Sequence, residues 1–505
     1  MVVAAPSLGA RSLGNGETSF GVWAPAAVAV AVRAGGNDHS LAPVGEGFHA
    51  GVAPVAPGAD YLFVLDEGEA WPDPCSRRQP AGVRGPSRVV AREAPAAAFD
   101  LALEEVVLYE LHVGTFTRDG TLAAAGRRLA ELRELGVTAV EVMPVGTFPG
   151  NRGWGYDGLH TWAPHEVYGG PDGLRAFVAV AHELELGVVL DVVYNHVGPG
   201  SEAFRAFGPW FTDRFETPWG DALDYRLRGV REWAIQNAEH WVREYAIDGL
   251  RLDAVHAVAD DEPEHVLAEL ARRVHALRPG ALVISEMGMP DFRPLEQWGH
   301  DAMWLDSLHH ELHVALTGER DGYYAAHDGS MSAIARELRR PQGGRLVACA
   351  QNHDQFGNRA VGNRLPVAKL RLAQAVVLFS RFTPLLFQGE EHAEPRPFQF
   401  FTDHLDPRIA EATREGRRRE FAAFAGFDGE VPDPQALATF ERSVLEPAAG
   451  DREQRRFVER LLCLRRELPQ ELVVNADDAA RTLELRRGRA CLRLDFAALS
   501  VELDA

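Results

Sequence analysis

The pattern of hydrophobic and polar positions changes about one hundred residues into the chain. Before that point, short apolar runs such as 28–32 and 61–65 have the composition of strands, and clusters of glycine and proline separate them. Helical periodicity is hard to find in this part of the chain. The pattern predicts an N-terminal β-sandwich over residues 1–98, which ends in a linker at the proline- and alanine-rich stretch 94–98.

From residue 106 onward, apolar runs alternate with amphipathic stretches of helical period. The runs are continuously apolar, which is typical of strands that are covered on both faces. Eight such units in succession predict a (β/α)8 TIM barrel of the α/β class over residues 99–468, and a doubly wound parallel sheet is the alternative. The eight runs are 106–112, 137–143, 188–195, 249–254, 281–286, 301–306, 345–354 and 384–391.

Three further segments complete the organisation of the chain. Residues 198–228, between the third run and its helix, are rich in proline and tryptophan, and we interpret them as a small inserted lid. Helix-like sequence over 455–468 closes the barrel region. The alternating segment 482–503 predicts short strands, which we assign to a small C-terminal β domain over 469–505.

Composition narrows the class of protein. The formal net charge of −21 argues against a nucleic-acid partner, because phosphate binding requires clustered basic side chains. No apolar stretch approaches membrane-spanning length, so we expect no membrane partner. The four cysteines are far apart and form no C-x-x-C pair, so neither a disulfide scaffold nor a metal knuckle is predicted. We therefore expect a cytoplasmic protein with reduced thiols.

Ionisable side chains stand where the predicted strands end. In a barrel of this type, those ends converge on one face, and burying carboxylates or imidazoles there is costly unless they are paired. Their occurrence at equivalent depth on neighbouring strands is the strongest functional signal in the sequence. The residues concerned are Asp191 and His196, Arg251 and Asp253, Glu286, and His353 and Asp354.

This set of residue types fits the cleavage of a glycosidic bond. One carboxylate attacks the anomeric carbon, and a second, protonated carboxyl donates to the leaving oxygen. Asp253 suits the nucleophile, since Arg251 two residues earlier faces the same side of the strand and would hold it ionised. Glu286 suits the acid/base, and Asp354 would stabilise the distorted sugar through its hydroxyl groups.

The remaining candidates are substrate-binding residues. His196 and His353 are predicted donors to sugar hydroxyls, and Tyr156 fits sugar stacking as well as loop packing. We add Asp191 and His256 to this group, although a structural role is also typical of a lone histidine. Signatures of metalloproteases, phosphate-binding loops and serine hydrolases are missing from the sequence, and we predict neither a metal nor a cofactor.

Four stretches resemble, in order, the four short motifs of the α-amylase superfamily. This resemblance implies a retaining mechanism with Asp253 as nucleophile, Glu286 as acid/base and Asp354 as transition-state stabiliser. The matching stretches are 191–196, 249–253, 284–286 and 351–354.

Within the superfamily, the chain is most similar to the malto-oligosyltrehalose trehalohydrolase family. That resemblance implies hydrolysis of the α-1,4 bond next to the terminal trehalose of maltooligosyltrehalose, with release of trehalose. It also implies a glucan-binding-like N-terminal module, no obligatory metal, and malto-oligosyltrehalose synthase as the functional partner. The stretches that carry it are 71–80, 109–116, 308–313, 317–319, 351–359, 400–404, 431–434 and 439–442.

Two other functions remain open at this point. A glycogen branching or debranching enzyme would share the four motifs and the front β-sandwich. A non-catalytic glucan-binding protein on the same barrel is the alternative from a different class. Such proteins typically lose a catalytic carboxylate, whereas this chain keeps all three.

Overall fold

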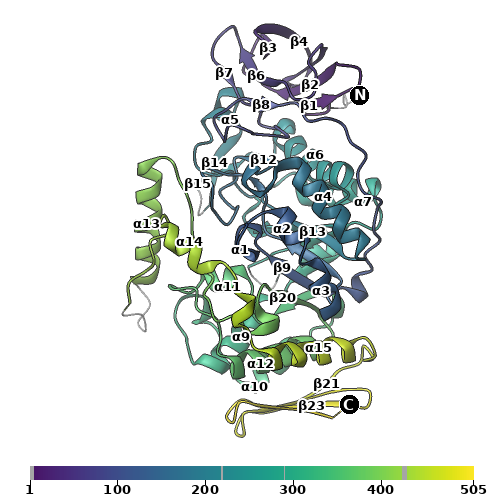
Figure 1. Cartoon of the computed structure of the whole chain (residues 1–505), viewed down its shortest axis with the longest axis vertical. Coiled ribbons are helices and arrows are strands. Elements are labelled where there is room, and N and C mark those ends of the chain that lie inside the picture. Colours follow the sequence, from purple (N-terminus) through teal and green to yellow (C-terminus); the bar gives the residue numbers. More distant parts are fainter. Residues whose placement is uncertain (1–4, 218–219, 289–290, 423–428, 505) are drawn as a thin grey trace.

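The structure is a computed structural model that describes residues 5–217, 220–288, 291–422 and 429–504. Three parts follow one another along the long axis of the molecule (Figure 1). An N-terminal sheet lies at one end, a barrel surrounded by helices forms the middle, and a small C-terminal sheet lies at the other end. The predicted barrel with flanking β domains is confirmed.

The N-terminal sheet has the order β1-β2-β5-β4-β3-β6-β7, and β8 pairs with β6. The long strand β4 (Asn37–Gly45) pairs through its first half with β3 and through its second half with β5. The two halves of the sheet enclose a core of their own, as a sandwich requires. The other strands are β1 (Gly9–Ser12), β2 (Thr18–Trp23), β3 (Val30–Ala34), β5 (Phe48–Ala53), β6 (Asp60–Leu65), β7 (Ala70–Trp71) and β8 (Ser87–Arg88).

The middle of the molecule is a closed barrel of eight parallel strands. Each strand coincides with one of the eight apolar runs, although β13 and β20 begin one residue before theirs. Because β20 pairs with β9 and closes the ring, the doubly wound alternative is excluded. The strands are β9 (Leu108–Leu111), β10 (Ala139–Val142), β13 (Gly187–Val192), β16 (Gly249–Leu252), β17 (Leu282–Ser285), β18 (Ala302–Trp304), β19 (Leu346–Cys349) and β20 (Thr383–Phe387).

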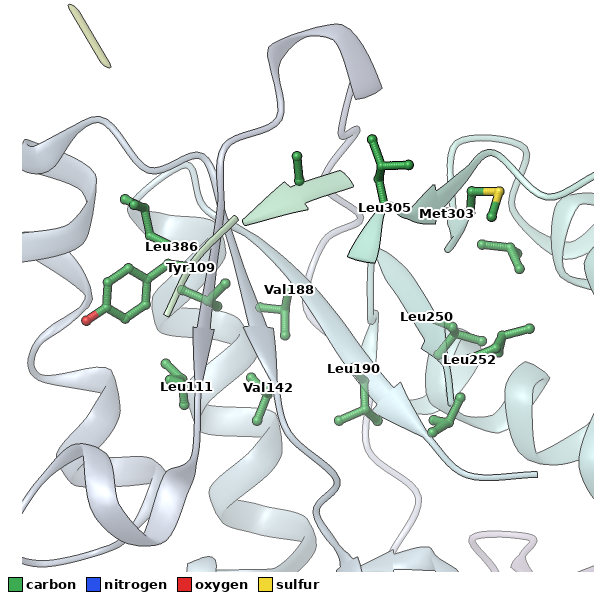
Figure 2. Close-up of a cluster of buried hydrophobic side chains, with 14 of the residues drawn as sticks. Tyr109, Leu111, Val142, Val188, Leu190, Leu250, Leu252, Met303, Leu305 and Leu386 are labelled. Atoms are coloured by element: carbon green, nitrogen blue, oxygen red, sulfur yellow. The ribbon is translucent and has the colours of Figure 1, made fainter. Parts of the chain in front are cut away.

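Alternation along the barrel strands divides their side chains into two sets. One set, which includes Leu111, Val142, Leu190 and Leu252, joins the large core that the helices share (Figure 2). The other set begins with an apolar layer that forms a separate cluster, made of Leu108, Ala139, Val189, Ile284, Ala302, Val347 and Leu385. Two residues further along, four of these strands carry an acidic side chain in the same direction: Glu110, Glu141, Asp191 and Glu286. The strand geometry itself therefore builds part of the site.

The helices cover the barrel with their apolar faces. In α7, the buried residues Val266, Leu267, Leu270, Ala271 and Val274 recur at the spacing of one helical face. None of the helices in the described ranges is long and apolar enough to cross a membrane. The helices of the barrel region are α2 (Leu122–Gly126), α3 (Leu129–Leu135), α4 (Gly170–Glu183), α6 (Arg228–Tyr245), α7 (Val266–Leu277), α9 (Asp306–Thr317), α10 (Met331–Leu338), α12 (Val367–Phe379) and α15 (Arg452–Arg465), with the short helices α1 (Val113–Phe116), α8 (Arg293–Glu296) and α11 (His353–Gly357).

The segment interpreted as a lid contains helix α5 (Glu202–Phe207) and a hairpin of β14 (Phe211–Thr217) and β15 (Gly220–Leu223). Its Phe207 belongs to the core of the N-terminal sheet, where its ring lies 6.0 Å from that of Phe63. The segment is therefore anchored to the N-terminal sheet.

The end of the chain forms an antiparallel sheet of β21 (Val473–Asp477), β22 (Thr482–Arg487), β23 (Ala490–Asp495) and β24 (Ser500–Asp504). Buried Arg487 fixes this sheet to the barrel, because it donates to the carbonyl oxygen of Ser380 at 2.8 Å. Helices α13 (Pro407–Ala422) and α14 (Leu437–Ser443), which follow β20 in the chain, project along one side of the barrel (Figure 1).

Candidate active site

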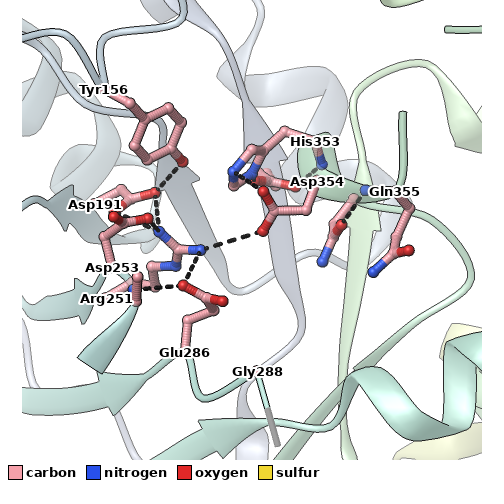
Figure 3. Close-up of polar contacts among 12 residues, drawn as sticks. Tyr156, Asp191, Arg251, Asp253, Glu286, Gly288, His353, Asp354 and Gln355 are labelled. Carbon is pink, nitrogen blue, oxygen red and sulfur yellow. Dashed lines mark hydrogen bonds and ion pairs between the residues drawn. The ribbon is translucent and has the colours of Figure 1, made fainter. Parts of the chain in front are cut away.

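Arg251, which is completely buried, connects the acidic residues of the site. Its Nη1 donates to both carboxylate oxygens of Asp191, at 2.9 and 2.8 Å, and to Asp253 at 2.7 Å. Its Nη2 lies 3.4 Å from Glu286 and 3.6 Å from Asp354. One guanidinium therefore contacts four carboxylates (Figure 3): Asp191 on β13, Asp253 and Glu286 directly after β16 and β17, and Asp354 in α11.

The acidic side chains around Arg251 keep its guanidinium positively charged. Burial opposes its charged form, but Asp191 and the neighbouring acidic groups outweigh burial and raise the pKa of Arg251. The guanidinium also lies 4.3 Å from the ring of Trp304, in a cation–π contact. For Asp191, burial is the larger effect and raises the pKa to about 6 despite the arginine.

Glu286 follows directly after β17, and Asp253 follows directly after the neighbouring strand β16. Its carboxylate accepts the backbone N–H of Ala254, a residue with the left-handed φ of 39°. Such a conformation is strained for a residue with a side chain, and strain of this kind is frequent at functional sites. Burial raises the pKa of Glu286 well above that of an ordinary carboxyl group; Arg251 opposes this shift, and Asp354 adds to it.

The apolar run 345–354 predicted that Asp354 would lie at the end of the seventh strand, but the structure places it elsewhere. The strand β19 ends at Cys349, and Asp354 belongs to the first turn of α11. Asn352 starts this helix, because its side chain accepts the backbone N–H of Gln355 at 3.0 Å. Asp354 still reaches the same face of the barrel as the other carboxylates.

A histidine links Asp354 to the first strand of the barrel. His353 Nε2 lies 3.2 Å from Asp354, while its Nδ1 and its backbone N–H contact the carboxylate of Glu110 on β9. Burial raises the pKa of Asp354, but the charge and hydrogen bond of His353 outweigh burial and lower it to about 2. The side chain of Asp354 is 43 % exposed, so it is open to a ligand.

Tyr156 and His196 form the opposite side of the site. The Tyr156 hydroxyl donates to Asp191 at 2.6 Å, and its ring stacks on that of His353 at 5.0 Å. His196 Nε2 lies 3.0 Å from the backbone oxygen of Tyr156. Asn195 donates from its side chain to Asp253 at 2.7 Å, so two donors, Arg251 and Asn195, orient that carboxylate.

His256 lies at the Glu286 side of the site and is exposed. Its Nδ1 accepts the backbone N–H of Gly288 at 3.2 Å. Burial lowers the pKa of His256, and the charges of Asp253 and Asp354 act in the opposite direction. The structure therefore brings every predicted site residue to one end of the barrel.

Sequence reasoning missed three acidic residues of this region, Glu110, Glu141 and Asp306. Glu110 and Glu141 are register partners on β9 and β10, and both are 1 % exposed. Burial, then the charge of Glu110, raises the pKa of Glu141 well above the ordinary range. Burial, followed by Asp354, raises the pKa of Asp306 to about 7. Glu110 and Glu141 could have been recognised in the sequence, because each is a carboxylate inside an otherwise apolar run.

The side chains of the candidate site do not have the arrangement of a metal-binding site. Within the described ranges, no group of three or more histidine, cysteine or acidic residues has the arrangement that could hold one. The acidic side chains instead converge on a guanidinium, which already supplies the positive charge of the site.

A closed parallel barrel that brings two carboxyl groups, Asp253 and Glu286, together at the ends of adjacent strands has the arrangement of a glycoside hydrolase. Residues 97–209 match the family described as alpha amylase, catalytic domain. A crystal structure of a protein from Salmonella typhimurium, described as an alpha amylase, is 35% identical, with a TM-score of 0.87 over 97% of this chain and 93% of that one.

Two relatives make the assignment more specific. The malto-oligosyltrehalose trehalohydrolase of Deinococcus radiodurans is 43% identical over 92% of this chain and 83% of its own length. The enzyme of the same name from Arthrobacter ramosus is 42% identical over 93% of this chain and 91% of its own length. This chain belongs to the malto-oligosyltrehalose trehalohydrolase family.

Proposed function

We propose that the protein hydrolyses the α-1,4-glucosidic bond next to the terminal trehalose of maltooligosyltrehalose and releases trehalose, with retention of configuration. The substrate and product are those that the names of the relatives indicate. The main support for this mechanism is the difference between the two carboxyl groups. Asp253 accepts a hydrogen bond from Arg251 at 2.7 Å, whereas the pKa of Glu286 is raised by burial.

In the first step, Asp253 attacks the anomeric carbon and forms a covalent glycosyl–enzyme bond. Arg251 and Asn195 orient its carboxylate for this attack. Glu286, held protonated by its burial, donates its proton to the leaving oxygen, and trehalose departs.

In the second step, the deprotonated Glu286 accepts a proton from water, which attacks the same carbon and breaks the bond to Asp253. Asp354, whose pKa is low and whose side chain is partly exposed, binds hydroxyl groups of the distorted sugar as an ionised acceptor. Two inversions at one carbon give net retention.

The surrounding residues position the sugar ring. Tyr156 offers an aromatic face, and His196 and His353 line the sugar site beside it, with their ring nitrogens held by Tyr156 and Asp354. Asp191 neutralises part of the Arg251 charge, and His256 stands on the side of the leaving group.

The assignment of three domains over 1–98, 99–468 and 469–505, with a glucan-binding first domain, is part of the proposal. We further propose that malto-oligosyltrehalose synthase supplies the substrate by converting the reducing end of a glucan to trehalose. A cytoplasmic location suits this partnership, and the four cysteines are free thiols.

A product assay tests the proposal. The protein is incubated in parallel with maltooligosyltrehalose and with amylose, and the products are separated by chromatography. Free trehalose from the first substrate, with unchanged branching of the second, is the expected result. New branch points in amylose without trehalose release would instead identify a branching enzyme, and no turnover of either substrate would favour a binding protein.

A further inference from the structure

A small cavity of about 20 Å³ lies where strand β1 meets helices α4 and α6, between the N-terminal sheet and the barrel (Figure 1). We propose that this cavity binds a single halide ion, chloride under ordinary conditions, against Arg77, Arg175 and His240. None of the wall residues belongs to the active site described above, so the inference is independent of the proposed function.

The wall of the cavity is rich in positive charge. It contains one acidic residue, Glu244, which pairs with Arg11 at 3.3 Å, and four arginines. The chain as a whole has a formal net charge of −21, so this concentration of arginines runs against its overall composition. Positive charge that is removed from water is costly unless an anion pairs with it. The four arginines are Arg11, Arg77, Arg92 and Arg175.

Arg175 on α4 contributes a guanidinium with unsatisfied donors. Its side chain is 13 % exposed, and its ion pair with Asp172 is long, at 3.6 Å, and involves a carboxylate that is itself 63 % exposed. The guanidinium also lies 5.0 Å from the ring of Tyr245. Its Nε and Nη1 atoms are nevertheless buried without a hydrogen bond to any residue that the structure describes. These N–H groups are therefore available to an anion.

Arg77 is fixed in the wall by the backbone of β1. Its Nη1 and Nη2 donate to the backbone oxygens of Ala10 and Leu8, at 2.8 and 3.0 Å. Gly9 between them has a φ of +79°, and a Cβ atom there would stand 2.5 Å from Nη1 of Arg77. The charge of Arg77 also acts on Asp73, which lies outside the wall. The guanidinium is thus held at the cavity by backbone oxygens, which carry only partial charges.

His240 on α6 contributes a neutral donor. The residue is 4 % exposed, and its ring stacks on that of Trp162 at 5.3 Å. Burial lowers the pKa of His240 well below 6.5; the charge of Arg77 adds to this shift, and the backbone of Trp162 opposes it. Neither ring nitrogen has a hydrogen bond of normal geometry to a described residue. A neutral imidazole has one N–H group, which can donate to an anion.

The volume of the cavity determines which anion fits. Roughly 10–15 Å³ is enough for one water molecule, so a cavity of about 20 Å³ holds one small ion and leaves no room for sulfate or phosphate. A water molecule would fit the same space, but it would leave Arg77 and Arg175 without a counter-ion. A halide ion is spherical, so it can accept hydrogen bonds from a loop and two helices at the same time.

Bromide tests the location of the site, because it replaces chloride and scatters X-rays anomalously. A crystal of the protein soaked in bromide should show an anomalous peak between Arg77, Arg175 and His240. Binding in solution is measured from the line width of chloride-35 in NMR, with chloride titrated at constant ionic strength and acetate as the balancing anion.

Variants test which side chains hold the ion. Arg175→Gln and His240→Phe remove donors from two different helices, whereas His240→Gln keeps an N–H group. Arg272→Gln is the matched control, because Arg272 on α7 is 58 % exposed and also pairs with an acidic residue three positions earlier, Glu269. Thermal unfolding verifies that each variant is folded. The two His240 variants decide the question if Arg175→Gln does not fold.

Arg175→Gln and His240→Phe should each bind chloride about tenfold more weakly, which corresponds to the loss of one hydrogen bond to a charged group. Arg272→Gln should bind it like the unmodified protein, and His240→Gln should bind it more tightly than His240→Phe. A crystal without a bromide peak in the cavity would overturn the inference. A peak combined with unchanged chloride binding in the folded variants would indicate an adventitious ion only. Displacement of chloride by sulfate at equal ionic strength would overturn the assignment to a halide.

Discussion

The carboxylate of Glu110 accepts both the backbone N–H and the ring Nδ1–H of His353. The other ring nitrogen of His353 faces Asp354 at 3.2 Å, so carboxylates flank the imidazole at both nitrogens. Burial alone would lower the pKa of His353, but Asp354 and Glu110 outweigh it and raise this pKa well above 6.5. The histidine is therefore an imidazolium, and it donates to both acids.

Replacing Glu110 by glutamine removes one of these two charges. The pKa of His353 should then fall, and the ring should lose a proton at lower pH than in the unmodified protein. Nitrogen-15 NMR of histidine-labelled protein, recorded across a pH series, measures this directly. Glu104→Gln, at an exposed position, is the matched control. An unchanged titration of His353 in Glu110→Gln would show that Glu110 does not set its charge.

Asp253→Ala should lower turnover of maltooligosyltrehalose by roughly 10³–10⁶-fold, because no covalent intermediate can form. The initial rate of trehalose release, measured by chromatography, checks this. Asp213→Ala on β14, where the side chain is exposed, should retain normal turnover. Normal turnover in Asp253→Ala would exclude it as the nucleophile.

The pH profile of the unmodified protein reports the acid/base group. Burial raises the pKa of Glu286, and only the protonated form donates to the leaving oxygen. The value of kcat/KM should therefore be maintained above the ordinary range of a carboxyl group and should fall as the pH rises through the pKa of Glu286. A profile that declines already near pH 5 would contradict this assignment.

Glu141→Gln should stabilise the protein at alkaline pH. Burial and Glu110 raise the pKa of Glu141 in the folded state, so folding requires its protonated form. Stability is complete below the pKa of the unfolded chain and is lost as the pH rises towards that of the folded state. We expect the Tm of Glu141→Gln to exceed that of the unmodified protein by roughly 2–4 °C at pH 8.

The same comparison at pH 4 is the internal control for Glu141. There the carboxyl group is mostly protonated in the unfolded state as well, so the two proteins should unfold at similar temperatures. An equal difference in Tm at both pH values would indicate an effect of packing instead of ionisation.

Arg251→Met should lower the free energy of unfolding by about 3–5 kcal/mol, because it leaves Asp191 and Asp253 buried without their cation. Chemical denaturation followed by tryptophan fluorescence measures this loss. The same substitution at Arg118, whose side chain is 81 % exposed, should have little effect. Equal effects of the two substitutions would show that the carboxylates do not depend on Arg251.

The barrel was predictable because its strands are buried on both faces and therefore differ in composition from the amphipathic helices. The carboxylates at the strand ends were predictable for the same reason, since a charge that ends an apolar run is conspicuous. Glu110 and Glu141 were not predicted, because they stand inside runs whose other residues dominate the pattern. Their partners come from distant parts of the chain, and periodicity contains no information about such pairings.

The position of Asp354 shows a second limit of pattern reading. Its apolar run continues past the end of β19, and only the capping of α11 by Asn352 decides where the strand stops.

The closure of the barrel by β9 and β20 has a consequence for biosynthesis. Leu108 pairs with Leu385, so the first barrel strand keeps an open edge until almost 280 further residues have been translated. The N-terminal sheet, in contrast, is complete once Arg88 has emerged from the ribosome. The nascent chain therefore carries one sheet with all its strands, whose core is completed only by Phe207, beside an incomplete barrel sheet. This interval is the one in which a chaperone would protect the chain most.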